Sequence, residues 1–291
     1  MAWREIIYQY DGSFDGLLCC IYESYTQKER PTAILCGGDA EPNLFEIRTV
    51  PTVREHAGRV ERSLRAVSNE VVPFLRRAFL TDLPDRELAI YRFVVRLYRE
   101  GAPYLSRLSD DAYQPLLRAV RRLSTEVEHL RGFIRFSVFD GMLGTEIEPK
   151  NRVLPLLRAH FCDRCYNETF FIYDRTHREA LLYSGGRSRI VPLEDFEMAP
   201  PDEEEASYRR LWKRFYDTVA IRERENPRLR MSNMPKRYWR TMTEFQPDAG
   251  TQPAALSAAT PADGQARGAP DATPAPVKRQ EPARSATASG T

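Results

Sequence analysis

The sequence lacks the features that mark membrane or secreted proteins. No apolar run approaches the roughly 18 residues that a membrane-spanning helix needs. The first residues, MAWREIIYQYDG, have no basic segment followed by a long apolar stretch, so we expect no secretion signal. The chain of 291 residues has only five cysteines, an odd number that does not suit a disulfide framework. We therefore expect a protein of the reducing cytoplasm with no membrane partner.

The common catalytic motifs are also missing. There is no GxSxG nucleophile elbow, no HExxH zinc motif, no Walker A sequence and no GxGxxG following a strand. The four histidines show no metal-ligand spacing to one another. One C-x2-C pair, Cys162 and Cys165, could supply half of a tetrahedral thiolate site, but a zinc site normally has two such pairs. We expect these cysteines to be packed or incidental, and we expect no metal and no cofactor.

Lysine is scarce as well, because only five of the 43 basic residues are lysine and the other 38 are arginine. Arginine binds phosphate groups through two parallel hydrogen bonds and stacks on planar groups, which suits nucleic acid. A codon bias toward arginine would give the same composition, and the net charge of +2 favours neither explanation.

Aromatic residues end well before the chain does. Residues 246–291 contain no Trp, Tyr, Phe or Ile and are rich in Pro and Ala, so they cannot bury enough apolar surface to fold. We expect a disordered tail there. The remaining residues suffice for one large or two small cores. We divide them into 1–128 and 129–245 and expect the two parts to form one compact body.

The first part has short strands followed by helices. EIIYQY (5–10) predicts a strand, and Ser13 is a suitable N-cap for a helix whose apolar residues begin at Phe14. TAILCGG (32–38) and LFEIRTV (44–50) predict two more strands. Residues 52–128 have helical periodicity throughout, and Gly101 suits a helix C-cap.

The second part changes to strand periodicity at residue 131. Asp140-Gly141 is a strong two-residue hairpin signal. In that register three pairs share a core face: Val138 with Leu143, Phe136 with Thr145, and Ile134 with Ile147. Arg135 then lies opposite Glu146 on the other face, which predicts a cross-strand ion pair. A short helix at 151–161 and strands within 169–191 follow, so we expect an α+β fold: a mainly helical body with a hairpin–helix–hairpin antiparallel sheet unit.

A last helix is predicted after Pro200-Pro201, with Asp202 as its cap. Its apolar residues lie at helical spacing and predict a buried stripe: Tyr208, Leu211, Trp212, Phe215, Tyr216 and Val219. MPKRYWR (234–240) follows, with large rings among cations, a pattern that suits base stacking. We expect Trp239 to be buried, Tyr238 to be the exposed stacking ring, and Lys236 and Arg237 to face solvent.

Two groups of cations are candidate phosphate contacts. One group surrounds the hairpin and the helix after it: Arg131, Arg135, His160 and Arg164. The other comprises Lys236, Arg237 and Arg240. The alternative for each residue is structural, because Arg135 could simply pair with Glu146 and His160 could be a satisfied core histidine. The prediction depends on the fold bringing the two groups together.

Six blocks stand out together in the chain: YDGSFDGLLC (10–19), HLRGFIRF (129–136), IEPKNRVLPLLRAHFCDR (147–164), FIYDRTHREALLY (171–183), LWKRFYDTVAIRERENP (211–227) and MPKRYW (234–239). Their order and spacing resemble an uncharacterised bacterial family labelled "probable DNA metabolism protein", a domain of unknown function. The resemblance spans nearly all of residues 5–245. It implies a radical-SAM neighbour assigned to DNA modification or repair. Some relatives carry a fused uracil-DNA-glycosylase-like domain, which we do not expect here because only the predicted tail follows Glu244.

Three functions remain open from the sequence. The first is a DNA-binding accessory protein that presents DNA to a radical-SAM partner. The second is an enzyme acting on a nucleobase, with His129 or His160 as the general acid–base, since an imidazole titrates near neutral pH. The third is a protein-interaction scaffold without DNA affinity. The sequence leaves the reaction and the oligomeric state open.

Overall fold

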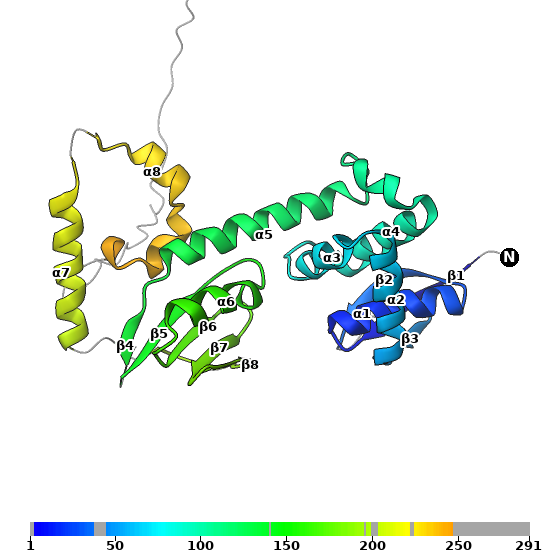
Figure 1. The fold of residues 1–291 in the computed structure, drawn as a ribbon, viewed down its shortest axis with the longest axis horizontal. Coiled ribbons are helices and arrows are strands. Elements are labelled where there is room, and N and C mark those ends of the chain that lie inside the picture. Colours follow the sequence, from blue (N-terminus) through cyan, green and yellow to red (C-terminus); the bar gives the residue numbers. More distant parts are fainter. Residues whose placement is uncertain are drawn as a thin grey trace, which may run out of the picture. The chain divides into compact units, whose positions relative to one another are not determined.

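The computed structural model describes residues 3–37, 45–139, 141–194, 196–198, 203–221 and 224–246. The described part has helices and two separate sheets, which confirms the α+β class (Figure 1). The predicted tail lies outside the described residues except for Gln246. Among the described residues, no helix combines the length and apolar character needed to cross a membrane.

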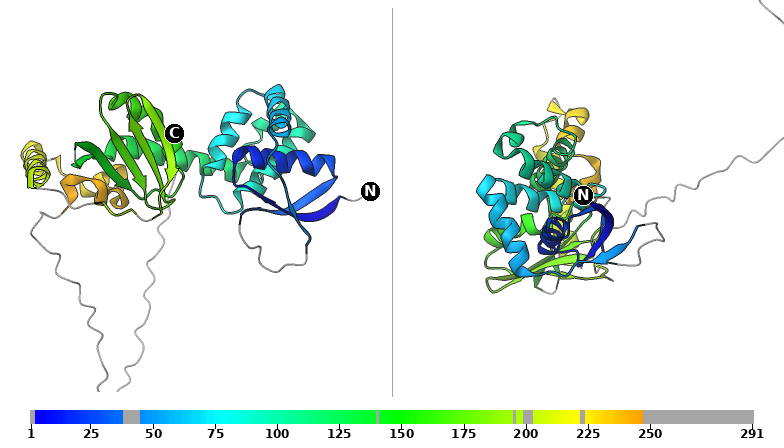
Figure 2. Two further views of the ribbon diagram at one scale, coloured as in Figure 1. Left: turned by 90° about the horizontal axis from the view of Figure 1, so that it is seen from below. Right: turned by 90° about the vertical axis from the view of Figure 1, so that its right-hand side faces the viewer.

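The first sheet is a small parallel β–α–β unit. Its elements are β1 (Arg4–Tyr10), α1 (Phe14–Thr26), β2 (Glu29–Cys36) and β3 (Ile47–Thr49). The strand order is β2-β1-β3, and β1 pairs in parallel with both neighbours, with α1 as the crossover between β1 and β2 (Figure 2). Ser13 caps α1 as predicted, because its side chain accepts a hydrogen bond from the Gly16 amide at 2.9 Å.

Helices complete the first hydrophobic core. They are α2 (Arg54–Val67), α3 (Val71–Phe79), α4 (Arg86–Glu100), the 3-10 turn η1 (Ala102–Ser106) and α5 (Gln114–Phe133). The predicted cap Gly101 ends α4, with a positive φ of 69° that a residue without a Cβ adopts easily. Leu116 of α5 belongs to this first core, whereas Leu123, Val127 and Leu130 of the same helix belong to a second core. The predicted division at 128/129 therefore falls inside α5.

The second sheet follows the predicted order of hairpin, helix and hairpin. Its elements are β4 (Ser137–Phe139), β5 (Met142–Ile147), α6 (Leu154–Arg164), β6 (Phe170–Asp174), β7 (Glu179–Ser184) and β8 (Arg187–Pro192), arranged in that strand order. Figure 1 shows α6 against this sheet, and its Leu157 and Phe161 are buried in the second core. All neighbouring pairs are antiparallel except β5–β6, which is parallel because α6 returns the chain to the same end of the sheet.

The hairpin register is confirmed by the pairing of Val138 with Leu143, although Asp140 of the predicted turn lies outside the described residues. Val138 shares its face with Leu143 and Phe170, which pack in the second core, so the predicted face is correct, but its side chain is 49% exposed because β4 is the edge strand of the sheet. Ile134 is buried, but as the C-cap of α5 rather than as a strand residue.

The C-terminal elements are α7 (Glu203–Val219), α8 (Pro227–Asn233), and the 3-10 turns η3 (Lys236–Thr241) and η4 (Thr243–Phe245). The predicted cap Asp202 lies outside the described residues. The prediction of a buried stripe on α7 is wrong, because no residue of this helix is buried. The helix contacts η4 and β4 through side chains such as Trp212 and Arg209.

Candidate nucleic-acid interface

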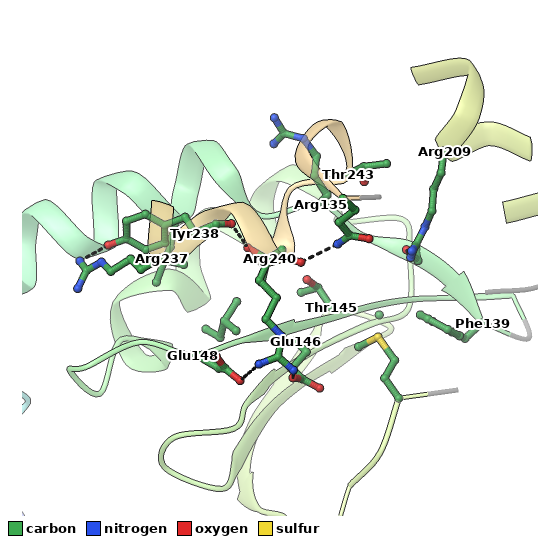
Figure 3. Close-up of a pocket in the computed structure, with 17 residues that line it drawn as sticks. Arg135, Phe139, Thr145, Glu146, Glu148, Arg209, Arg237, Tyr238, Arg240 and Thr243 are labelled. Carbon is green, nitrogen blue, oxygen red and sulfur yellow. Dashed lines mark hydrogen bonds and ion pairs between the residues drawn. The ribbon is translucent and has the colours of Figure 1, made fainter. Parts of the chain in front are cut away.

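A cavity of about 280 Å³ lies where β5 meets the last described segment, residues 236–246. Four arginines line it: Arg135, Arg209, Arg237 and Arg240 (Figure 3). They come from the segment just after α5, from α7 and from η3, so the fold brings together side chains that are far apart in sequence. We call this site the arginine cavity. Three of its four arginines are predicted from the sequence, and Arg209 is not.

Arg135 is held by a buried carboxylate. Its Nη2 lies 3.0 Å from Glu244 Oε1, and its Nη1 donates to the Gly132 carbonyl at 2.9 Å. Glu244 also accepts a hydrogen bond from Trp212 Nε1 at 3.2 Å, so it connects α7 to the cavity wall. The predicted Arg135–Glu146 ion pair is wrong. Arg135 lies outside the β4–β5 ladder, so nothing fixes it opposite Glu146.

Arg240 crosses from η3 to the carboxylates at the end of β5. Its Nη1 lies 2.5 Å from Glu148 Oε1, and its Nη2 lies 3.8 Å from Glu146 Oε1. Arg175 pairs with the same two carboxylates at 3.5 and 3.3 Å. The Arg240 side chain is nevertheless 60% exposed, so much of its guanidinium group is open to solvent.

Arg237 connects η3 to α5. Its Nη2 lies 3.3 Å from Glu126 Oε1 and donates to the Tyr238 hydroxyl, while its guanidinium group lies over the Tyr238 ring. Glu126 is buried on α5, where it also accepts hydrogen bonds from the amides of Lys150 and Asn151 at 3.1 and 3.0 Å. The same carboxylate therefore fixes both the loop after β5 and one arginine of the cavity.

Both rings of the MPKRYWR segment are packed, which is wrong for the predicted place of Tyr238 and only partly right for Trp239. Tyr238 is only 4% exposed and lies in the second core, where burial raises the pKa of its hydroxyl. Trp239 is half-buried and stacks on Phe245, with a centroid distance of 4.5 Å. The 3-10 turn that follows Pro235 points residue 238 inward, so Tyr238 is not an exposed stacking ring. Lys236 is exposed as predicted and lies over the Trp239 ring at 5.8 Å.

Each arginine of the cavity has a carboxylate partner, since Arg209 also pairs with Glu205 at 2.8 Å. Three of these partners, Glu126, Glu205 and Glu244, have side chains at most 11% exposed. These buried carboxylates therefore fix the orientation of the guanidinium groups of Arg135, Arg209 and Arg237. The site is consequently a set of positioned donors and has no large excess of positive charge.

The remaining predicted cations lie elsewhere, because His129, Arg131, His160 and Arg164 do not line the arginine cavity. Arg131 donates to Glu128 at 2.8 Å and to the Leu156 carbonyl at 3.3 Å, so its guanidinium group is held by neighbouring residues of α5 and α6. Arg164 is exposed, and no ion pair to it occurs within the described ranges.

The two candidate catalytic histidines are packed side chains. His129 stacks on Phe133 with a centroid distance of 5.4 Å, and its buried Nδ1 has no partner among the residues described. Burial, with Arg237 nearby, lowers the pKa of His129. Burial, with Arg131 and Arg164 nearby, lowers the pKa of His160, whose Nε2 is also buried without a partner in the described part. Both imidazoles are therefore mostly neutral at neutral pH.

The cysteines of the C-x2-C pair are free, half-buried thiols, and burial raises the pKa of Cys165. Within the part of the chain that the structure describes, no three His, Cys, Asp or Glu side chains are grouped as metal ligands. Neither thiol therefore belongs to a recognisable metal site in that part.

One comparison with known protein families covers the whole site. No curated protein and no solved structure matches the chain. A family model described as a domain of unknown function, DUF4130, matches residues 84–244, which is more than half of the chain. This range includes all four arginines of the cavity. The chain therefore belongs to the DUF4130 family of domains of unknown function.

Proposed function

We propose that the protein is a DNA-binding accessory protein of DNA metabolism, and that the arginine cavity and the neighbouring Lys236 contact the phosphate backbone. The observation that carries the proposal is the convergence of Arg135, Arg209, Arg237 and Arg240 on one cavity. Arginine binds phosphate oxygens through two parallel N–H donors. A guanidinium group that a carboxylate already holds in place can offer its other N–H donors to a phosphate in a fixed direction. The resemblance stated above supports the same context and extends the proposal to a radical-SAM partner.

The ion pairs set the expected strength of binding. Of the four cavity arginines, only Arg240 and Arg237 have side chains more than 40% exposed, and Lys236 lies beside them on η3. Phosphates must compete with Glu148 and Glu146 for Arg240. We therefore expect few phosphate contacts and modest affinity. Three contacts on duplex DNA give a slope of about −2.7 in a plot of log K against log salt concentration.

The packed histidines weigh against the enzymatic alternative. A general acid–base must reach the reacting group within hydrogen-bond distance. His129 and His160 lie outside the arginine cavity, and their imidazoles are packed against neighbouring rings.

The test is a fluorescence-anisotropy titration of labelled single- and double-stranded DNA at several salt concentrations. The variant Lys236→Gln with Arg240→Gln removes two exposed cations and keeps hydrogen-bonding groups at both positions. Affinity should fall, and the duplex slope should become shallower by about 1.8. The control, Arg118→Gln with Arg122→Gln, makes the same change in charge at exposed positions on α5. Arg118 lies about 18 Å along the helix axis from Leu130, the α5 residue that lines the cavity, so this control leaves the cavity unchanged.

A second variant tests whether the ion pairs compete with DNA. Glu148→Gln removes one partner of Arg240 and should strengthen binding, because the guanidinium group is then freer to meet a phosphate. Wild-type binding that is insensitive to salt, or equal losses in the cavity variant and its control, would rule out the proposed interface.

A further inference from the structure

A second cavity, a groove of about 430 Å³, is formed by α1 and α2 together with one side chain of α4. Two buried apolar residues, Ile21 and Val60, belong to its lining. The rest of the lining is aromatic or polar: Tyr22, Tyr25, Thr26, Arg59, Ser63 and Tyr98. Among the described residues, no carboxylate lines this groove, whereas every arginine of the arginine cavity has a carboxylate partner. We call it the tyrosine groove.

Aromatic rings stay partly exposed along the tyrosine groove. Tyr25 is 40% exposed and lies between Trp3 and Tyr98, at centroid distances of 5.5 and 5.8 Å and nearly perpendicular to both rings. Trp3 is exposed to the same extent. Exposed rings that adjoin one another, unlike single exposed apolar residues, mark a binding surface. A ring face that solvent reaches can stack on a planar group.

Arg59 adds a cation to these rings. Its guanidinium carbon lies 5.6 Å from the centroid of the Tyr22 ring, and Tyr22 stacks in turn on His56 at 4.0 Å. Arg59 is exposed, and no ion pair to it occurs within the described ranges. Its N–H donors are therefore open to an acceptor or an anionic group of a ligand.

Three hydroxyl groups of the groove donate within the protein. Ser63 Oγ donates to the Val60 carbonyl at 2.7 Å, so the Tyr98 hydroxyl, 2.5 Å from Ser63 Oγ, donates to Ser63. Thr26 Oγ1 donates to the Tyr22 carbonyl at 3.0 Å. Because their protons are used, these oxygens offer a ligand lone pairs, which accept from N–H groups.

We propose that the tyrosine groove binds an unpaired nucleobase of single-stranded DNA. A base has a planar face for the rings, acceptors for arginine and N–H donors for hydroxyl oxygens, so it matches all three features of the groove. In duplex DNA the faces are stacked and the pairing edges are occupied, so the groove should select single strands. The inference uses no residue of the arginine cavity, and either site can fail its test without the other.

The first experiment titrates the full chain into a four-nucleotide single strand of three thymidines and one 2-aminopurine, a fluorescent base whose emission falls when it stacks. Wild type should quench the probe to saturation. Tyr25→Leu keeps apolar bulk but removes the flat ring, and it should raise the Kd about tenfold, as expected for one lost stacking contact. The matched control is Tyr166→Leu, which removes a ring that is 67% exposed outside the groove and should bind like wild type.

A second pair of variants tests the cation. Arg59→Gln should raise the Kd of the same probe about two- to fivefold. Arg62→Gln on the same helix should not, because residue 62 lies about 200° around the axis of α2 from Val60, which lines the groove. Circular dichroism of all variants should match that of wild type.

The cavity variant Lys236→Gln with Arg240→Gln separates the two sites, because it should quench the short probe like wild type. A wild-type chain that does not quench the probe, or equal losses in Tyr25→Leu and Tyr166→Leu, would overturn the proposal. Quenching that is lost in the cavity variant and kept in Tyr25→Leu would also overturn it, and would assign the stacked base to the arginine cavity.

Discussion

Replacing Glu126 with alanine is expected to destabilise the protein by about 3–5 kcal/mol, because this carboxylate is buried and serves several donors at once. Its oxygens accept from the backbone amides of Lys150 and Asn151, from the Asn151 side chain at 2.6 Å, and from Arg237. Each donor left buried without a partner costs about 1–3 kcal/mol, and the partial exposure of Lys150 and Arg237 keeps the sum near this range.

The assay is urea unfolding followed by far-ultraviolet circular dichroism. Glu126→Gln keeps one carbonyl acceptor and should cost less, about 1–2 kcal/mol. The matched control is Glu128→Ala on the same helix, whose carboxylate is 67% exposed in a pair with Arg131 and should contribute less than about 0.5 kcal/mol. If Glu126→Ala unfolds at the same urea concentration as Glu128→Ala, the idea that Glu126 fixes the loop and η3 is wrong.

Three further outcomes follow from local geometry. Ser13→Ala removes the cap of α1 and should lower the free energy of unfolding by about 1 kcal/mol in the same urea assay, whereas Ser13→Thr keeps the hydroxyl and should cost much less. Gly144→Ala puts a Cβ 2.4 Å from the Phe171 ring and should cost about 1–3 kcal/mol; a melting temperature equal to wild type would show that the ring moves aside freely. The pKa of His160 lies below 6.5 in the folded protein, so the unfolded chain binds the proton more readily, and stability should fall as the pH drops below 6.5. Urea midpoints across this pH range should fall less steeply for His160→Gln, and identical pH profiles would contradict the assignment.

Local chemistry predicts much of the fold. The Ser13 cap, the Gly101 cap and the pairing of Val138 with Leu143 depend on neighbours within a few residues, and the structure contains all three. Pairings across long stretches of chain are different. Arg135 meets Glu244 across 109 positions, and no spacing rule selects that partner over Glu146.

The cavity is only partly predictable for the same reason. Arg237 and Arg240 stand out because they flank rings in a basic segment. The i,i+4 pair of Arg209 with Glu205 is visible in the sequence, but it gives no sign that Arg209 lines a cavity. The burial of Tyr238 depends on the direction of one 3-10 turn. The spacing on α7 identifies an apolar face, but it does not say whether that face is buried, and no residue of this helix is.

The packing of α4 shows that the range matched by the family model is shorter than the unit that folds together. The family match starts at residue 84, just before α4, yet Phe93, Val94 and Leu97 of α4 are fully buried in a core built largely from earlier elements. That helix contacts β2 and α3, both of which precede residue 84. A recombinant fragment of 84–244 would expose this apolar side and should precipitate. Any homologue with a different N-terminal region must supply another cover for the same helix.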